Sequence, residues 1–157
     1  MVMTATLPRI YKEKLQEMGI KFEYSEFIKN TTRHKIEIID KLINKDIEEI
    51  KEKSKNKKVL IIVNTINKAI ELYKALKNDA VKKVNLLHSR FEQEDRSEKE
   101  RNIKKFSKQK DESGIWITTQ IVEASLDIDF DMLYTEMSTL DSLFQRFGRC
   151  YRSREYE

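Results

Sequence analysis

The chain has 157 residues, which suits one domain, and a folded domain of this size buries roughly 70% of the surface that its unfolded chain exposes. Its single cysteine, Cys150, excludes an internal disulfide and any metal site built from several cysteines. The formal net charge of +4 is too small to identify a polyanionic partner, and no apolar run approaches the roughly 20 residues of a membrane-spanning helix. We therefore expect a cytoplasmic protein without a membrane partner.

The region before residue 59 is predicted to contain one amphipathic helix. A possible edge strand lies near Ile36, and a stretch of helical period follows it. The apolar stripe of that stretch consists of Ile39, Leu42, Ile43, Ile47 and Ile50.

From residue 59 onward, short apolar runs alternate with longer stretches of helical period. The predicted strands are 59–63, 84–87, 115–118 and 132–136, and the predicted helices are 66–76, 95–106 and 140–147. This alternation is the pattern of βαβ units whose strands are buried on both faces. The predicted fold class is therefore α/β, an open and mostly parallel sheet with helices on both faces.

Polar side chains follow three of the predicted strands. Thr65, Ser89, Arg90 and Thr119 stand at the carboxyl ends of these strands, where open α/β sheets bind ligands. Taken one at a time, each hydroxyl could instead bond to its local backbone. Asp127, taken alone, is typical of a turn or a helix cap.

The sharpest pattern is the octet at residues 145–152, Gln-Arg-Phe-Gly-Arg-Cys-Tyr-Arg. On a helix, Arg149 and Arg152 would share a face and present two guanidinium groups to one anion, with Arg146 one turn earlier. Planar guanidinium groups bind phosphate through paired hydrogen bonds and stabilise charge on a transferring phosphoryl group. A basic surface helix is the alternative interpretation.

Two other side chains invite functional interpretations. His88 has only His34 as a histidine companion, and no cysteine or carboxylate stands at ligand spacing, so no metal site is expected. Trp116 lies in the apolar run 115–117, which favours core packing over stacking on a nucleic-acid base.

The octet resembles motif VI of superfamily-two helicases, and other stretches resemble further motifs in the family's order. Residues 4–8 resemble motif III, 59–65 motif IV, 87–91 the phosphate-contacting loop that follows, and 118–129 motif V. Within the superfamily, the sequences of residues 3–8, 87–91 and 122–129 are most similar to those of the CRISPR-associated helicase-nuclease of type I systems. Tyr151 stands where many related motors carry glycine.

The resemblance implies a second RecA-like motor domain at residues 31–157. Residues 1–30 would be the end of motif III and a linker from a first motor domain that precedes this chain. The implied roles are arginine fingers for Arg149 and Arg152, nucleotide contacts for Gln145, Asp127 and Arg146, coupling between domains for Thr4 and Thr6, and contacts to the phosphates of single-stranded DNA for Thr65, Ser89, Arg90 and Thr119.

By the same resemblance, the first motor domain would make most of the contacts to ATP and Mg²⁺. The chain has no Gly-Lys pair and thus no phosphate-binding loop, and its only Asp-Glu pair, Asp111-Glu112, resembles no Mg²⁺ motif. We expect no metal on this chain and no ATP hydrolysis by it alone. The resemblance further implies an RNA-guided surveillance complex and a nuclease domain as partners. Two alternatives stay open: another superfamily-two DNA or RNA helicase, and a non-catalytic RecA-like module that binds nucleic acid.

Overall fold

The computed structural model describes residues 13–14, 16–19, 34–77 and 83–152. The chain divides into two compact units, residues 1–31 and 32–157, and each is described by itself. In the first unit a helical turn ends at Gly19, where φ is +71°. Thr4 and Thr6, which were predicted to couple two domains, lie outside the described residues.

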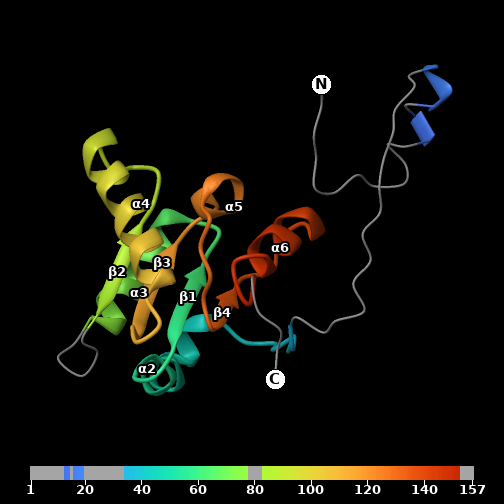
Figure 1. The fold of residues 1–157 in the computed structure, drawn as a ribbon. Helices are drawn as coiled ribbons and strands as arrows, with labels where there is room; N and C mark the ends of the chain where they lie inside the picture. The colour runs from blue at the N-terminus through green and yellow to red at the C-terminus, as the bar shows by residue number, and fades with distance from the viewer. Residues whose placement is uncertain (1–12, 15, 20–33, 78–82, 153–157) are drawn as a thin grey trace. The chain divides into compact units, whose positions relative to one another are not determined.

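The second unit is built on a four-stranded, all-parallel sheet (Figure 1). The strands are β1 (Lys58–Ile62), β2 (Val84–Leu87), β3 (Gly114–Thr118) and β4 (Met132–Thr135), in the order β2-β3-β1-β4. Each predicted strand is present with its ends within one residue of the prediction. The predicted α/β class with a parallel sheet is therefore confirmed.

Helices cover both faces of this sheet. The helices of this unit are α2 (Ile47–Ser54), α3 (Ile66–Leu76), α4 (Gln93–Lys108), α5 (Ile121–Ser125) and α6 (Leu140–Phe147), of which α2 to α5 pack on the sheet. Alternate residues of β1 point to opposite faces, so Leu60 packs in one core with α4 and α5, and Ile61 packs in the other with α2 and α3. Trp116 is buried in the first core against Phe106, which confirms its predicted packing role. No helix in the described part of the chain is long and apolar enough to span a membrane.

The region before β1 differs from the prediction. Residues 34–42 form no strand or helix, and Ile36, Ile39 and Leu42 are exposed. Only a 3₁₀ turn, η1 (Ile43–Lys45), and then α2 follow. The predicted edge strand and the early helix start are therefore wrong, because apolar periodicity produces a buried face only where the sheet offers a surface to pack against. The five-residue α5 was not predicted, since it is too short to show a helical period.

Candidate nucleotide and nucleic-acid site

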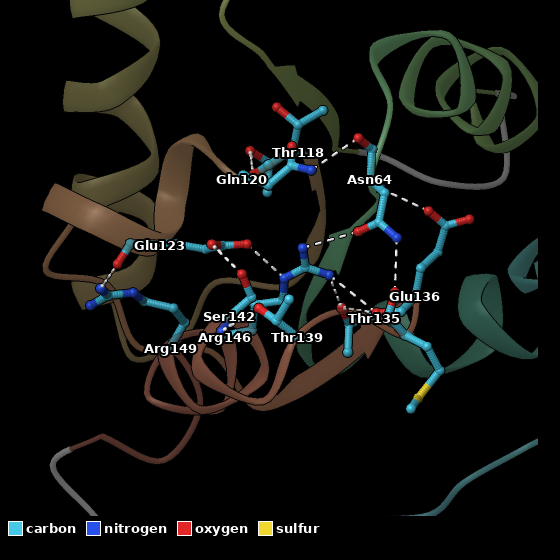
Figure 2. A network of polar contacts seen from close by, with 12 residues as sticks. Asn64, Thr118, Gln120, Glu123, Thr135, Glu136, Thr139, Ser142, Arg146 and Arg149 are labelled. Carbon is cyan, nitrogen blue, oxygen red and sulfur yellow. Dashed lines mark hydrogen bonds and ion pairs between the residues drawn. The ribbon is translucent and has the colours of Figure 1, made fainter. Parts of the chain in front are cut away.

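The loops that leave the carboxyl ends of β3, β1 and β4 meet at one edge of the sheet (Figure 2). Gln120 Nε2, after β3, donates a hydrogen bond to the carbonyl of Asn64, after β1, at 2.9 Å. The backbone N–H of Asn64 donates to Glu136 Oε2, after β4, at 2.7 Å. Three segments that are distant in sequence therefore form one bonded edge.

The predicted contacts to nucleic acid lie along this edge and its continuation after β2. Thr65 is exposed at the start of α3, and its hydroxyl accepts a hydrogen bond from the backbone N–H of Lys68 at 3.4 Å. Ser89 and Arg90 are exposed in the turn after β2. Thr119 is only 4% exposed, so its hydroxyl presents little surface to a phosphate. Thr65 caps a helix and is still open to solvent, so the cap and a phosphate contact are compatible.

His88 shapes the turn that carries Ser89 and Arg90. Its buried ring stacks on Phe91 with centroids 4.2 Å apart, and the backbone N–H of Arg90 donates to His88 Nδ1 at 3.3 Å. Burial lowers the pKa of His88, and the positive charges of Arg90 and Lys99 lower it further. His88 Nδ1 thus serves as an acceptor for the backbone of the turn.

Arg149 and Arg152 lie beyond the end of α6 and not on it. The predicted helix 140–147 is confirmed, with Thr139 as its N-cap and Gly148 as its C-cap. Arg149 then continues in a turn, and Cys150 forms an isolated parallel bridge with Phe130. The helical spacing that placed the two arginines on one face is therefore not the cause of their arrangement, which the turn and the bridge determine.

Arg152 nevertheless pairs with the Asp127 carboxylate, and the charge of the same carboxylate acts on the pKa of Arg149. Arg152 Nε lies 3.3 Å from Asp127 Oδ1, and Arg149 Nη2 donates to the carbonyl of Glu123 at 2.5 Å. Burial lowers the pKa of Arg149, and the charge of Arg152 lowers it further, while Asp127 and Glu123 oppose the change. Arg149 Nε is buried without a hydrogen-bond partner among the described residues. Two neighbouring guanidinium groups on a partly open face are suited to bind an anion.

The other predicted nucleotide contacts, Asp127 and Gln145, are both exposed. Asp127 follows α5, whose N-cap is Gln120 and whose C-cap is Leu126, so it caps neither end of that helix. Gln145 lies on α6, one turn before Arg149. Their roles at a nucleotide stay predictions.

Arg146 departs from the predicted arrangement because its side chain is 0% exposed. Nε donates to Glu123 Oε1 at 2.8 Å, Nη1 to Thr135 Oγ1 at 2.8 Å, and Nη2 to Asn64 Oδ1 at 3.0 Å. Each guanidinium nitrogen thus already donates to a protein acceptor. Arg146 lies inside the domain and does not join Arg149 and Arg152 on their partly open face.

The polar residues around Arg146 were missed at the level of sequence. They are Asn64, Glu123, Thr135, Glu136 and Ser142 (Figure 2). Glu136 follows β4 directly and Asn64 lies two residues after β1, at the strand ends where the predicted contacts also lie, and this signal could have drawn attention to them. Nothing in the local sequence indicates that they converge on one arginine.

Tyr151 has a φ of +48°, in the left-handed region that favours glycine. A glycine would adopt this conformation without the steric cost that a side chain carries. Tyr151→Gly is expected to be more stable than Tyr151→Ala by about 1–2 kcal/mol, because both lack the ring and only alanine keeps the backbone penalty. Urea unfolding of the two variants measures the difference. Equal stabilities would show that the backbone relaxes without strain.

Comparisons with known proteins identify the family of this chain. Residues 55–155 match the family model of the C-terminal part of the CRISPR-associated nuclease/helicase Cas3. The chain belongs to this family. It is 41% identical to the CRISPR-associated nuclease/helicase Cas3 of Methanothermobacter thermautotrophicus over 99% of this chain and 20% of that protein. The resemblance seen in the motifs is thereby confirmed: this is the C-terminal helicase domain of a Cas3-like superfamily-two helicase.

Solved Cas3 structures share the fold. The crystal structure of T. fusca Cas3 superposes with a TM-score of 0.62 at 28% identity, over 71% of this chain and 14% of that chain. A structure of a CRISPR RNA-guided surveillance complex before nicking matches with a TM-score of 0.61 at 28% identity, again over 71% and 14%. The sheet is therefore the RecA-like sheet of helicase C-terminal domains. The chain spans about a fifth of the length of the curated Cas3 relatives that it matches over nearly its whole length.

Proposed function

We propose that this Cas3-family domain is the second motor domain of an ATP-dependent helicase that translocates single-stranded DNA in type I CRISPR interference, an antiviral defence. A first motor domain binds ATP with Mg²⁺, and Arg149 and Arg152 reach its γ-phosphate across the cleft. Gln145 and Asp127 complete the nucleotide's surroundings. The observation that carries this proposal is the pair of neighbouring guanidinium groups, Arg149 and Arg152, beside Asp127.

The carboxyl edge of the sheet supplies the grip on DNA in this proposal. Thr65, Ser89, Arg90 and the backbone at Thr119 contact the phosphates of one strand. Contacts to phosphates position a strand without reading its bases, so binding is expected to be independent of sequence. Closure on the first motor domain when ATP binds, and release after hydrolysis, then move the strand stepwise.

Membership of the Cas3 family supports the proposal that an enzyme containing this domain acts with other partners. A relative in a surveillance-complex structure shares the fold of this domain. We propose that the intact enzyme acts in the cytoplasm with an RNA-guided surveillance complex and delivers unwound DNA to a nuclease domain.

The chain alone is expected to show no DNA-stimulated ATP hydrolysis, because it lacks a phosphate-binding loop for the nucleotide. Phosphate release by the highly purified chain, with and without oligo-dT, tests this expectation. Turnover should appear when the chain is joined to a first motor domain. Turnover by the chain alone would contradict the division of labour between two domains.

Arg90→Ala is expected to weaken binding of oligo-dT and to reduce the slope of log affinity against log salt by about 0.7, the value for one phosphate contact on a single strand. Fluorescence anisotropy of labelled oligo-dT with the chain at several salt concentrations measures the slope. Arg101→Ala is the matched control, since Arg101 is an exposed arginine on α4. An unchanged slope in Arg90→Ala would exclude this side chain as a phosphate contact.

A further inference from the structure

Arg146 lies at the centre of the polar network in Figure 2, and its guanidinium group joins segments that are far apart in sequence. The acceptors come from α5, from the end of β4 and from the loop after β1, at Glu123, Thr135 and Asn64. A further hydrogen bond of 3.1 Å joins Nη1 to the carbonyl of Glu136. One side chain therefore joins α5, the end of β4 and the loop after β1, which carries the proposed DNA contact Thr65.

The central ion pair of the network, between Arg146 and Glu123, is shielded from water. The side chains of Arg146 and Glu123 are 0% and 11% exposed, and a second pair joins Lys68 Nζ to Glu136 Oε1 at 2.6 Å. Burial raises the pKa of Glu136, but the hydrogen bonds from Lys68 and Asn64 and the charges of Lys68 and Arg146 outweigh this effect and lower it. Buried ion pairs add little stability compared with apolar packing, and their best-supported use is to select one arrangement of the parts that they join.

Glu123 extends the network toward the proposed nucleotide site. One carboxylate oxygen accepts from Arg146, the other accepts from Ser142 Oγ at 3.0 Å, and the backbone carbonyl accepts from Arg149 Nη2 at 2.5 Å. The short helix α5 thus lies between the buried guanidinium group of Arg146 and the partly buried one of Arg149. A displacement of Arg146 must shift Glu123, and with it the acceptor that holds Arg149.

We propose that Arg146 and Glu123 are positioning residues that set the place of Arg149 according to the place of the DNA-binding loops. The inference rests on the proposed function for the ligands at the two ends. When a phosphate draws the loops at Asn64–Thr65 and Thr119–Gln120 toward it, the bonds to Asn64 and Thr135 move the guanidinium group of Arg146, and Glu123 passes the movement on. DNA binding and the nucleotide site are then coupled through a bonded path.

The experiment observes the side-chain N–H signal of Arg149 Nε in ¹⁵N-labelled chain, with and without oligo-dT. This proton is shielded from solvent, so it should exchange slowly enough to be seen, and its loss in Arg149→Lys assigns it. Arg146→Lys keeps the charge but replaces three nitrogens by one, and Thr135→Val removes one acceptor with almost no change of shape. Arg101→Lys is the control. Backbone signals of α3 report whether each variant is folded.

In the wild-type chain, the Arg149 signal should shift when oligo-dT binds. In Arg146→Lys it should shift or broaden without DNA and lose its response to DNA, with a smaller effect in Thr135→Val and none in Arg101→Lys. Affinity for oligo-dT should fall by roughly 2- to 30-fold in Arg146→Lys, the range for residues that carry coupling between sites.

An unchanged Arg149 signal in folded Arg146→Lys would overturn the inference, and if that variant does not fold, an unchanged signal in Thr135→Val would do so. If the wild-type chain does not bind oligo-dT, the proposed DNA grip is wrong. The DNA-free Arg149 signal in the variants still decides whether Arg146 positions Arg149, so the two failures are distinguishable.

Discussion

Arg149→Ala, in the enzyme that joins this domain to its first motor domain, is expected to lower the rate of ATP hydrolysis by about 10³- to 10⁵-fold, the range that arginine fingers supply. The guanidinium group stabilises charge on the transferring phosphoryl group, and alanine leaves that charge without a donor. Nucleotide binding should change little, because the first motor domain holds most of the nucleotide.

Single-turnover hydrolysis and the affinity for a fluorescent ATP analogue separate these two effects. Arg149→Lys should give an intermediate rate, since lysine keeps the charge but lacks the planar pair of donors. Arg101→Ala is the control on an exposed helix face. A normal rate of ATP hydrolysis in Arg149→Ala would exclude Arg149 as an arginine finger, and this conclusion does not depend on the rest of the proposal.

Arg146→Ala is expected to lower the free energy of unfolding of the chain by about 3–5 kcal/mol, the cost of removing one partner from a buried ion pair. The substitution leaves the Glu123 carboxylate, which is 11% exposed, without its cation, and it removes the donor to Asn64 and Thr135. Whole domains are stable by only roughly 5–15 kcal/mol, so this variant should lie near the limit of folding.

Urea unfolding followed by circular dichroism measures this loss. Arg96→Ala is the matched control, because Arg96 also pairs with a glutamate, Glu100 at 2.9 Å, but on an exposed helix face. That exposed pair should contribute less than about 1 kcal/mol. Similar losses in the two variants would show that Arg146 is not specially stabilising.

The two substitutions separate neighbouring arginines of one motif by what surrounds them. Arg149 is partly open, lies beside Arg152, and keeps an unpartnered N–H, whereas each nitrogen of Arg146 donates to the protein. We therefore expect Arg149→Ala to lower the rate of ATP hydrolysis with little change in the free energy of unfolding. Arg146→Ala is expected to lower mainly the free energy of unfolding.

The sequence by itself determined the parallel α/β sheet, its four strands and the family. Buried strands such as 59–63 consist of consecutive apolar residues, and the motifs of a helicase domain are local strings of residues, so both are visible without a structure. The tyrosine at position 151 was visible in the same way, and only the structure shows that its φ of +48° lies in the region that favours glycine.

Only the tertiary structure decided which arginines are available to a ligand. Spacing along a helix treats Arg146, Arg149 and Arg152 as equivalent, but the helix ends at Phe147, and a bridge between Cys150 and Phe130 sets the direction of the chain after it. Burial of Arg146 depends on Asn64 and Glu123, which lie 82 and 23 residues away in the chain. Contacts at such separations form only when the strands align, and a local pattern of residues does not contain them.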